Sequence, residues 1–251
     1  MLSNADTALL VGAGVLAGIV GTAGGITSLV SYPALLAVGV PRLPANVANI
    51  VALVACWPGS ALASQPELVG RGAWLRRWGL VAAAGGGVGS GLLLSTSAGA
   101  FARVVPFLIV VASVGLLAQP RVSAWLERHP SGKHRLLLPL GLFVVSVYNG
   151  YFGAGAGVMV LALLLLTTER HMARANALKN MLVGVATVVS AATYIAFGHV
   201  DWPAVVPLGV GMFFGATLGP RVARQVPANV LRWAVALTGF GLAIRLWVVP
   251  G

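Results

Sequence analysis

Apolar residues run through this chain in long stretches that short polar segments separate. A membrane-crossing helix needs about 20 mostly apolar residues at 1.5 Å per residue, so stretches of this kind predict transmembrane helices. Six stretches come close to that length. They cover residues 45–63, 78–94, 101–118, 175–197, 203–219 and 230–249.

Two further apolar stretches, residues 7–38 and 136–167, are too long for one crossing. Each would measure roughly 48 Å as an unbroken helix, which ordinary tilt does not fit into a bilayer. Glycine-rich segments at 21–25 and 149–157 mark where they break, because glycine destabilises a helix interior by about 1 kcal/mol. Each stretch is then either one crossing with an unwound middle or a hairpin that returns to its own side.

Positive charges decide between these two forms for the second stretch. A single crossing divides the Lys and Arg residues other than Lys179 eight against seven, whereas a hairpin divides them twelve against three, with only Arg42, Arg103 and Arg245 on the poorer side. The positive-inside rule expects the second division and places the richer side, with residues 120–135, in the cytoplasm. Legs of about 10 to 13 residues reach only about 15 to 20 Å, which favours re-entrance.

The chain also repeats itself. A shift of 132 positions places Gly18, Gly21 and Gly25 on Gly150, Gly153 and Gly157. A shift of 130 places Asn46 on Asn176, and a shift of 126 places Gly85 and Gly89 on Gly211 and Gly215. We therefore predict a first repeat over 1–119, a linker over 120–135 and a second repeat over 136–251.

Each repeat consists of a broken re-entrant hairpin and three transmembrane helices. An odd number of crossings turns the second copy upside down, so the predicted fold is an all-α polytopic membrane protein with two inverted repeats. That is a transporter architecture, in which broken elements meet near the midplane and present free backbone N–H groups to a ligand.

The two glycine-rich breaks are accordingly the first candidates for substrate binding. They comprise Gly21, Thr22, Ala23, Gly24 and Gly25, and then Asn149, Gly150, Gly153, Gly155 and Gly157. The same glycines could instead let helices pack closely.

Polar residues that follow the two hairpins complete the candidate site: Asn46, Asn49, Asn176, Lys179 and Asn180. A polar group at membrane depth is costly unless it is paired, so it predicts function. Lys179 would attract an anion, and the amides and Thr22 would replace lost water hydrogen bonds. Alternatively, Lys179 extends to the cytoplasmic surface.

Composition excludes a water-soluble globule, because 58% of the residues are hydrophobic and only 8% are charged. The net charge of +11 lies in short segments between apolar stretches, which indicates membrane topology and no nucleic-acid partner. No Lys or Arg precedes the first apolar stretch, so we expect that stretch to belong to the mature protein and not to a signal peptide.

The acidic residues favour an anionic substrate over a cation. All five lie at predicted loops or helix ends, so none supplies the midplane carboxylate of most cation-coupled carriers: Asp6, Glu67, Glu127, Glu169 and Asp201. The four histidines lack metal-ligand spacing, and the single cysteine, Cys56, can form no intrachain disulfide. We expect no metal and no cofactor.

Residues 18–49, 149–180 and 209–224 together resemble the sulfite exporter TauE/SafE family of membrane permeases. The resemblance implies an inner-membrane permease, not an enzyme, for small sulfur-containing or organic anions such as sulfite, thiosulfate or sulfonates. Alternating access between the two repeats would carry the anion across the membrane.

Two other functions stay open at this point. The breaks could form the filter of an anion or water channel. A membrane enzyme could use Cys56, although no partner base lies within helical reach of it. The direction of transport, the coupling ion and the oligomeric state, a homodimer included, stay open as well.

Overall fold

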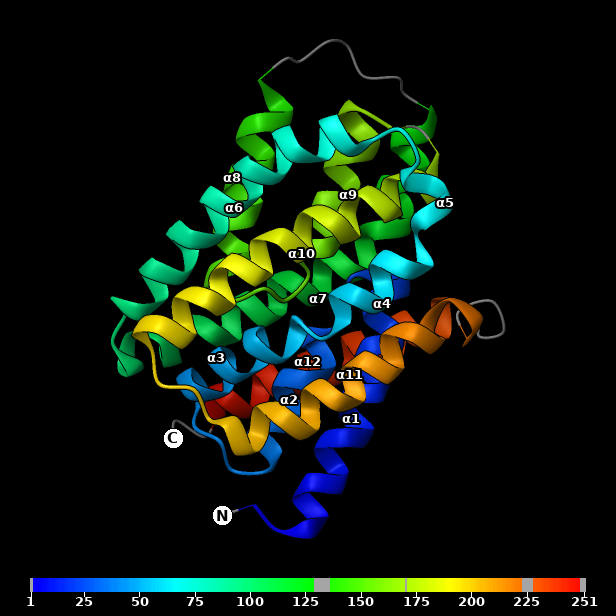
Figure 1. The fold of residues 1–251 in the computed structure, drawn as a ribbon. Coiled ribbons are helices and arrows are strands. Elements are labelled where there is room, and N and C mark those ends of the chain that lie inside the picture. The colour runs from blue at the N-terminus through cyan, green and yellow to red at the C-terminus, as the bar shows by residue number, and fades with distance from the viewer. Residues whose placement is uncertain (1, 129–135, 170, 223–227, 249–251) are drawn as a thin grey trace.

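The computed structural model describes residues 2–128, 136–169, 171–222 and 228–248, in which every regular element is a helix (Figure 1). The first half contains α1 (Asn4–Gly24), α2 (Ser28–Ala37), α3 (Arg42–Leu53), α4 (Cys56–Ala63), α5 (Gln65–Leu68) and α6 (Gly72–Leu94). The rest contains α7 (Ala98–Arg128), α8 (Leu137–Tyr151), α9 (Ala156–Thr167), α10 (Met172–Phe197), α11 (Trp202–Val222) and α12 (Ala228–Val248).

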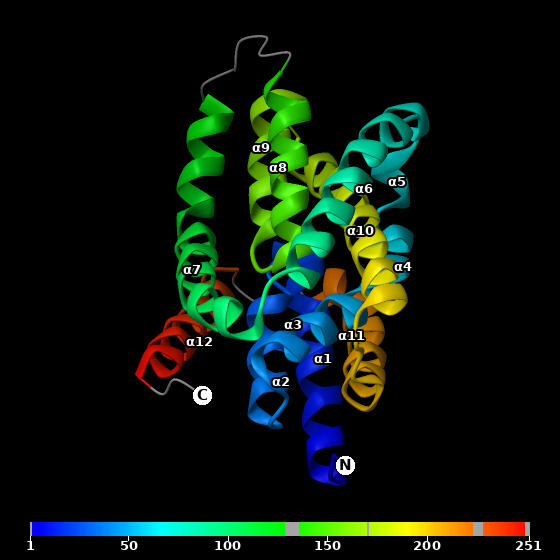
Figure 2. The same ribbon diagram turned by 90° about the vertical axis from the view of Figure 1, so that its left-hand side faces the viewer.

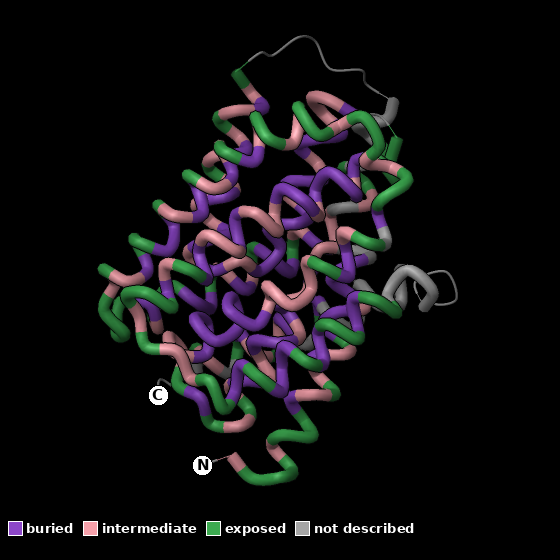
Figure 3. Tube along the Cα trace, in the orientation of Figure 1, coloured by how far each residue is buried: buried purple, intermediate pink, exposed green. Residues whose placement is uncertain are grey.

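The predicted all-α polytopic membrane fold is confirmed. Four described segments are long and apolar enough to cross a membrane: Asn4–Thr22, Arg42–Leu62, Ala98–Ala118 and Met172–Phe197. Large apolar side chains also lie exposed on the outside of the bundle, among them Leu80 and Phe197. Figure 3 shows buried residues gathered inside and exposed residues along the outer faces, as expected for helices that meet hydrocarbon.

Both helix breaks fall in the predicted glycine-rich segments. α1 gives way to α2 at Gly25, which adopts a left-handed conformation with φ 73° and donates its N–H to the Gly21 carbonyl at 2.8 Å. α8 gives way to α9 through Gly153 and Gly155, with φ of 81° and 77°. Side chains rarely tolerate this conformation, so glycine sets the position of each break.

The expected leg length of 10 to 13 residues is wrong for α1, which has 21 residues, and for α8, which has 15. α1 starts earlier than the apolar pattern because Ser3 and Asp6 form a capping box at its first turn. The legs α2 and α9 have 10 and 12 residues.

The predicted single helix over 45–63 is also wrong, since two helices, α3 and α4, occupy this stretch. Pro58 explains the interruption, because proline has no N–H and its ring clashes with the carbonyl one turn earlier, at Val54. The other predicted helices are present, and each begins earlier than predicted. α7 also continues to Arg128, past the predicted end at 118, and residues 129–135 of the predicted linker lie outside the described chain.

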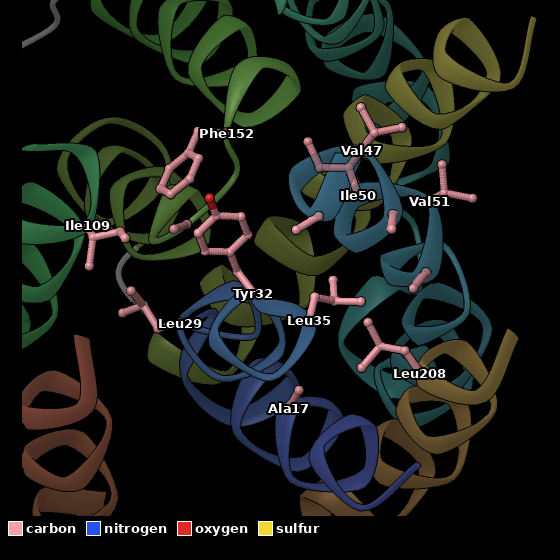
Figure 4. Packing of buried hydrophobic residues seen from close by; sticks show 14 of the residues in the cluster. Ala17, Leu29, Tyr32, Leu35, Val47, Ile50, Val51, Ile109, Phe152 and Leu208 are labelled. Atoms are coloured by element: carbon pink, nitrogen blue, oxygen red, sulfur yellow. The ribbon is translucent and has the colours of Figure 1, made fainter. Parts of the chain in front are cut away.

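The broken segments form two helix pairs, α1 with α2 and α8 with α9, which occupy different halves of the molecule (Figure 2). α1 packs along α11, and α8 packs along α6. Beneath the first break, Tyr32 of α2 meets the Phe152 ring edge to face at 5.6 Å, next to Leu35 and Ile50 (Figure 4). A buried core thus supports both breaks.

Glycines let the backbones approach closely in both long helix pairs, and the contacts correspond. Gly211 and Gly215 of α11 face the carbonyls of Val11 and Val15, and Gly85 and Gly89 of α6 face the carbonyls of Phe143 and Val147. The 126-residue shift relates Gly85 and Gly89 to Gly211 and Gly215, and the 132-residue shift relates the two valines of α1 to the two carbonyl residues of α8. The predicted first repeat thus supplies α6 as the partner of α8, and the predicted second repeat supplies α11 as the partner of α1.

Candidate functional site

The two helix breaks touch each other at the centre of the molecule. A Cβ atom on Gly157 would lie 2.8 Å from the Cα of Gly25, and one on Gly25 would lie 3.0 Å from the Cα of Gly157. The 132-residue shift relates these two glycines, so equivalent positions of the repeats meet in one contact. Only residues without side chains allow this approach.

A cavity of about 70 Å³ lies beside this contact, between α1, α4, α8 and α10. One water molecule needs roughly 10 to 15 Å³ on this scale, so the cavity can hold several waters or one small anion. Eight predicted site residues line it: Gly21, Thr22, Gly25, Asn149, Gly153, Gly157, Lys179 and Asn180.

Three nitrogen donors at this cavity are buried and have no hydrogen-bond partner: Nζ of Lys179, Nδ2 of Asn180 and Nε1 of Trp57. Lys179 is only 1% exposed, so its ammonium stays inside the protein and does not extend to the surface. Buried polar groups are normally paired, and each unpaired one costs roughly 1 to 3 kcal/mol or more. Three donors around one cavity therefore fit an acceptor ligand.

Among hydrogen-bond acceptor ligands, the charge of the lining favours an anion. The residues that line the cavity include one ammonium and no carboxylate. Glu169, the buried acid of the described residues, instead pairs with Arg71 at 2.9 Å and Arg174 at 3.4 Å. A negative ligand would thus meet Lys179 without a competing partner.

Hydroxyl and amide groups form the rest of the polar lining. Asn149 donates through Nδ2 to Oγ1 of Thr187 at 3.1 Å, and Thr22 donates its hydroxyl to the Gly18 carbonyl at 2.9 Å. These bonds fix the side chains of Asn149 and Thr22 at the cavity wall.

Asn46 and Asn176 lie at equivalent positions and hold the breaks in place from outside the cavity. Asn46 donates through Nδ2 to the Tyr151 carbonyl at 2.8 Å, at the end of α8. Asn176 donates through Nδ2 to the Thr22 carbonyl at 3.4 Å, near the end of α1. Each amide thus satisfies a free helix-end carbonyl of the opposite repeat.

The other predicted site residues are not among the described residues that line the cavity. Asn49 accepts from the Ser31 hydroxyl and donates to Oγ of Ser28 at 3.1 Å. Gly150 and Gly155 pack against the Gly86 carbonyl and Ala112, which is the packing role that the sequence left open. Ala23 and Gly24 complete α1, and their surroundings lie outside what the structure describes.

Sequence reasoning missed five polar or aromatic cavity residues, namely Thr27, Ser28, Trp57, Ser60 and Thr187, and it considered Cys56, which also lines the cavity, only as the thiol of a membrane enzyme. Trp57 carried a usable signal, because it lies in the middle of an apolar stretch, away from the span ends where tryptophan normally gathers. Among the described residues, no group of three His, Cys, Asp or Glu side chains is placed to hold a metal ion.

Comparison with known proteins identifies the family. The model of the sulfite exporter TauE/SafE family matches residues 8–246. The chain belongs to this family. The predicted resemblance is therefore confirmed, and the protein is a multi-pass membrane transporter of the permease type.

Curated relatives carry matching descriptions. A probable membrane transporter protein of Haemophilus influenzae is 24% identical, with 95% of this chain and 93% of the relative aligned. The probable membrane transporter protein YfcA of Escherichia coli is 22% identical over 92% of this chain and 86% of the relative. ORF9 of a Sinorhizobium species, also a probable membrane transporter protein, is 25% identical over 68% of this chain and 65% of the relative. No solved structure matches.

Proposed function

We propose that this protein carries small oxyanions across the inner membrane through the cavity between its two helix breaks. The observation that carries the proposal is the set of unpaired buried donors on Lys179, Asn180 and Trp57 around one cavity. The family description names sulfite, so sulfite, thiosulfate and small sulfonates are the substrates to test first.

The cavity suits the transfer of a hydrated anion into a desolvated site. An anion that leaves water loses its hydrogen bonds and needs donors in their place. The Lys179 ammonium supplies opposite charge, and the Asn180 amide and Trp57 indole supply neutral donors. A volume of about 70 Å³ favours compact anions over those with long organic chains.

The proposed transport cycle uses two inverted repeats that rock against each other about the contact of Gly25 with Gly157. The corresponding glycine contacts of α1 with α11 and of α8 with α6 support a two-fold relation between the repeats. Rocking about such an axis would open the central cavity to each side in turn.

Arginine contacts support the proposed division of the positive charges between the two sides of the membrane. Arg42, from the poorer side, donates to the carbonyls of Ala102 and Leu246, next to the other two arginines of that side. Arg71 and Arg174, from the richer side, meet at Glu169. Positions assigned to one side are thus neighbours in space.

The Lys179→Ala variant tests the proposal in proteoliposomes. Labelled thiosulfate or sulfite is taken up into vesicles preloaded with the unlabelled anion, and saturable exchange identifies a carrier. We expect uptake to fall at least about tenfold, because a hydrogen bond to a charged group contributes roughly 1.5 to 3 kcal/mol.

Arg76→Ala is the matched control, since it removes an exposed positive charge on α6 away from the cavity. Its uptake should equal that of the unmodified protein. Unchanged uptake in Lys179→Ala would remove Lys179 from the site, and uptake that does not saturate would indicate a channel.

A further inference from the structure

A second hollow lies on the outside of the bundle, between α7, α8 and α9, and shares no residue with the central cavity. It is an open groove of about 680 Å³, within the usual ligand-pocket range of roughly 300 to 1,000 Å³. Its walls include Val145 of α8 and Met159, Leu163 and Leu166 of α9.

One charged residue, Arg121 of α7, completes this lining and is exposed. Arg121 lies about one helical turn beyond the apolar span Ala98–Ala118, which places its guanidinium at headgroup depth. From Leu166 to Met159 the groove follows α9 for roughly 10 Å. The groove thus combines a positive charge at the membrane surface with an apolar wall along α9.

We propose that this groove binds one anionic glycerophospholipid, with its phosphate on Arg121 and an acyl chain along α9. An open apolar groove on the outside of a membrane-spanning bundle is filled with hydrocarbon, and the guanidinium selects the headgroup. Arginine is suited to this contact because its planar N–H groups match phosphate oxygens.

Glycine at position 141 helps to shape the groove floor. A Cβ atom there would lie 2.9 Å from Cδ1 of Leu163, so Gly141 lets α8 and α9 approach closely beneath the lipid.

Lipid competition on the purified full-length protein tests this site. The protein in detergent receives equal amounts of dioleoylphosphatidylglycerol and dioleoylphosphatidylcholine, which share acyl chains and differ in headgroup charge. Native mass spectrometry then counts the bound lipids. We expect about a fivefold preference for phosphatidylglycerol, the effect of one arginine near an anionic headgroup.

Two variants separate the headgroup from the chain. Arg121→Gln should lower the preference to near one while a lipid still binds, and Ala162→Trp, which fills the groove from α9, should remove one bound lipid of either kind. Arg76→Gln, an exposed arginine on α6, should behave as the unmodified protein does.

Three results would overturn the proposal. The first is full preference in Arg121→Gln, and the second is an equal loss in Arg76→Gln, which would indicate general surface charge. The third is a dimer without bound lipid that Ala162→Trp dissociates, because a second copy of the chain would then occupy the groove.

Discussion

Lys179 occupies the position that Asn49 holds in the first repeat, but the two side chains differ in their hydrogen-bond partners. Asn49 is fully engaged by Ser31 and Ser28, whereas the ammonium of Lys179 has no partner. The repeats therefore share a backbone plan while only the second places a charge at the cavity. This difference supports one proposed anion site at Lys179 and none at Asn49.

Trp57 supplies the donor that can be removed most cleanly. Its ring packs so closely on α10 that a side chain at Gly184 would collide with it, and its Nε1 is unpaired at the cavity. Trp57→Phe keeps an aromatic ring there and deletes the N–H. We expect KM for the transported anion to rise about tenfold, with little change in melting temperature.

The control for this variant is Trp202→Phe, which alters a half-exposed tryptophan at the start of α11. Initial uptake rates over a range of anion concentrations give KM and the maximal rate for each variant. An unaltered KM in Trp57→Phe would show that the indole serves packing alone.

The sequence identified part of the candidate site because some residues conflict with their surroundings. Lys179 and Asn149 are polar groups within apolar runs, and both line the cavity. Asn46 and Asn176 gave the same signal, yet their amides bind helix-end carbonyls beside it. A pattern shows that a buried amide needs a partner, but only the tertiary fold shows which partner it has.

At the scale of elements, the contact between the two breaks depends on the absence of a side chain at Gly157. Its backbone is helical, so alanine is sterically acceptable there apart from the collision with the Cα and carbonyl oxygen of Gly25. We expect Gly157→Ala to force the breaks apart and to destabilise the protein by about 1 to 3 kcal/mol.

Gly115→Ala makes the same change in α7, where a new Cβ would meet nothing within 4 Å. It should leave stability unchanged or raise it by up to about 1 kcal/mol, because alanine favours helix. The melting temperatures of Gly157→Ala and Gly115→Ala are compared by thermal unfolding, which is followed by the fluorescence of tryptophan or of a thiol-reactive dye. Equal melting temperatures would contradict a tight contact at the breaks.

The sequence predicts a helix break where glycine is required for a positive φ, but it predicts the ends of helices less well. Glycines with positive φ set both breaks inside the predicted segments. The break before α4 was missed although Pro58 was visible, because apolar length alone suggested one span across it. The early start of α1 was missed because the Ser3 capping box lies outside the apolar pattern.

At the scale of the whole molecule, the paired packing of α1 with α11 and of α8 with α6 ties the two repeats together. Neither repeat buries its first helix against its own later helix in this way, so each depends on the other for its long glycine contacts. This interlocking suits two units that move about a shared central contact. Their inverted orientation stays a prediction.

Thiol labelling of intact cells tests on which side of the membrane the loops of the first repeat lie, with Cys56→Ser as the background because Cys56 is the single cysteine. The hairpin topology places Ser97, between α6 and α7, outside the cytoplasm and Gln65, at the start of α5, inside it. Both residues are exposed. A membrane-impermeant maleimide should therefore label Ser97→Cys in intact cells and Gln65→Cys only after permeabilisation. Cys56→Ser itself should keep its transport rate, because the substitution replaces only the thiol sulfur at the cavity wall by a hydroxyl oxygen. Labelling of both sites from outside, or the reverse order, would contradict the proposed sidedness of the first repeat.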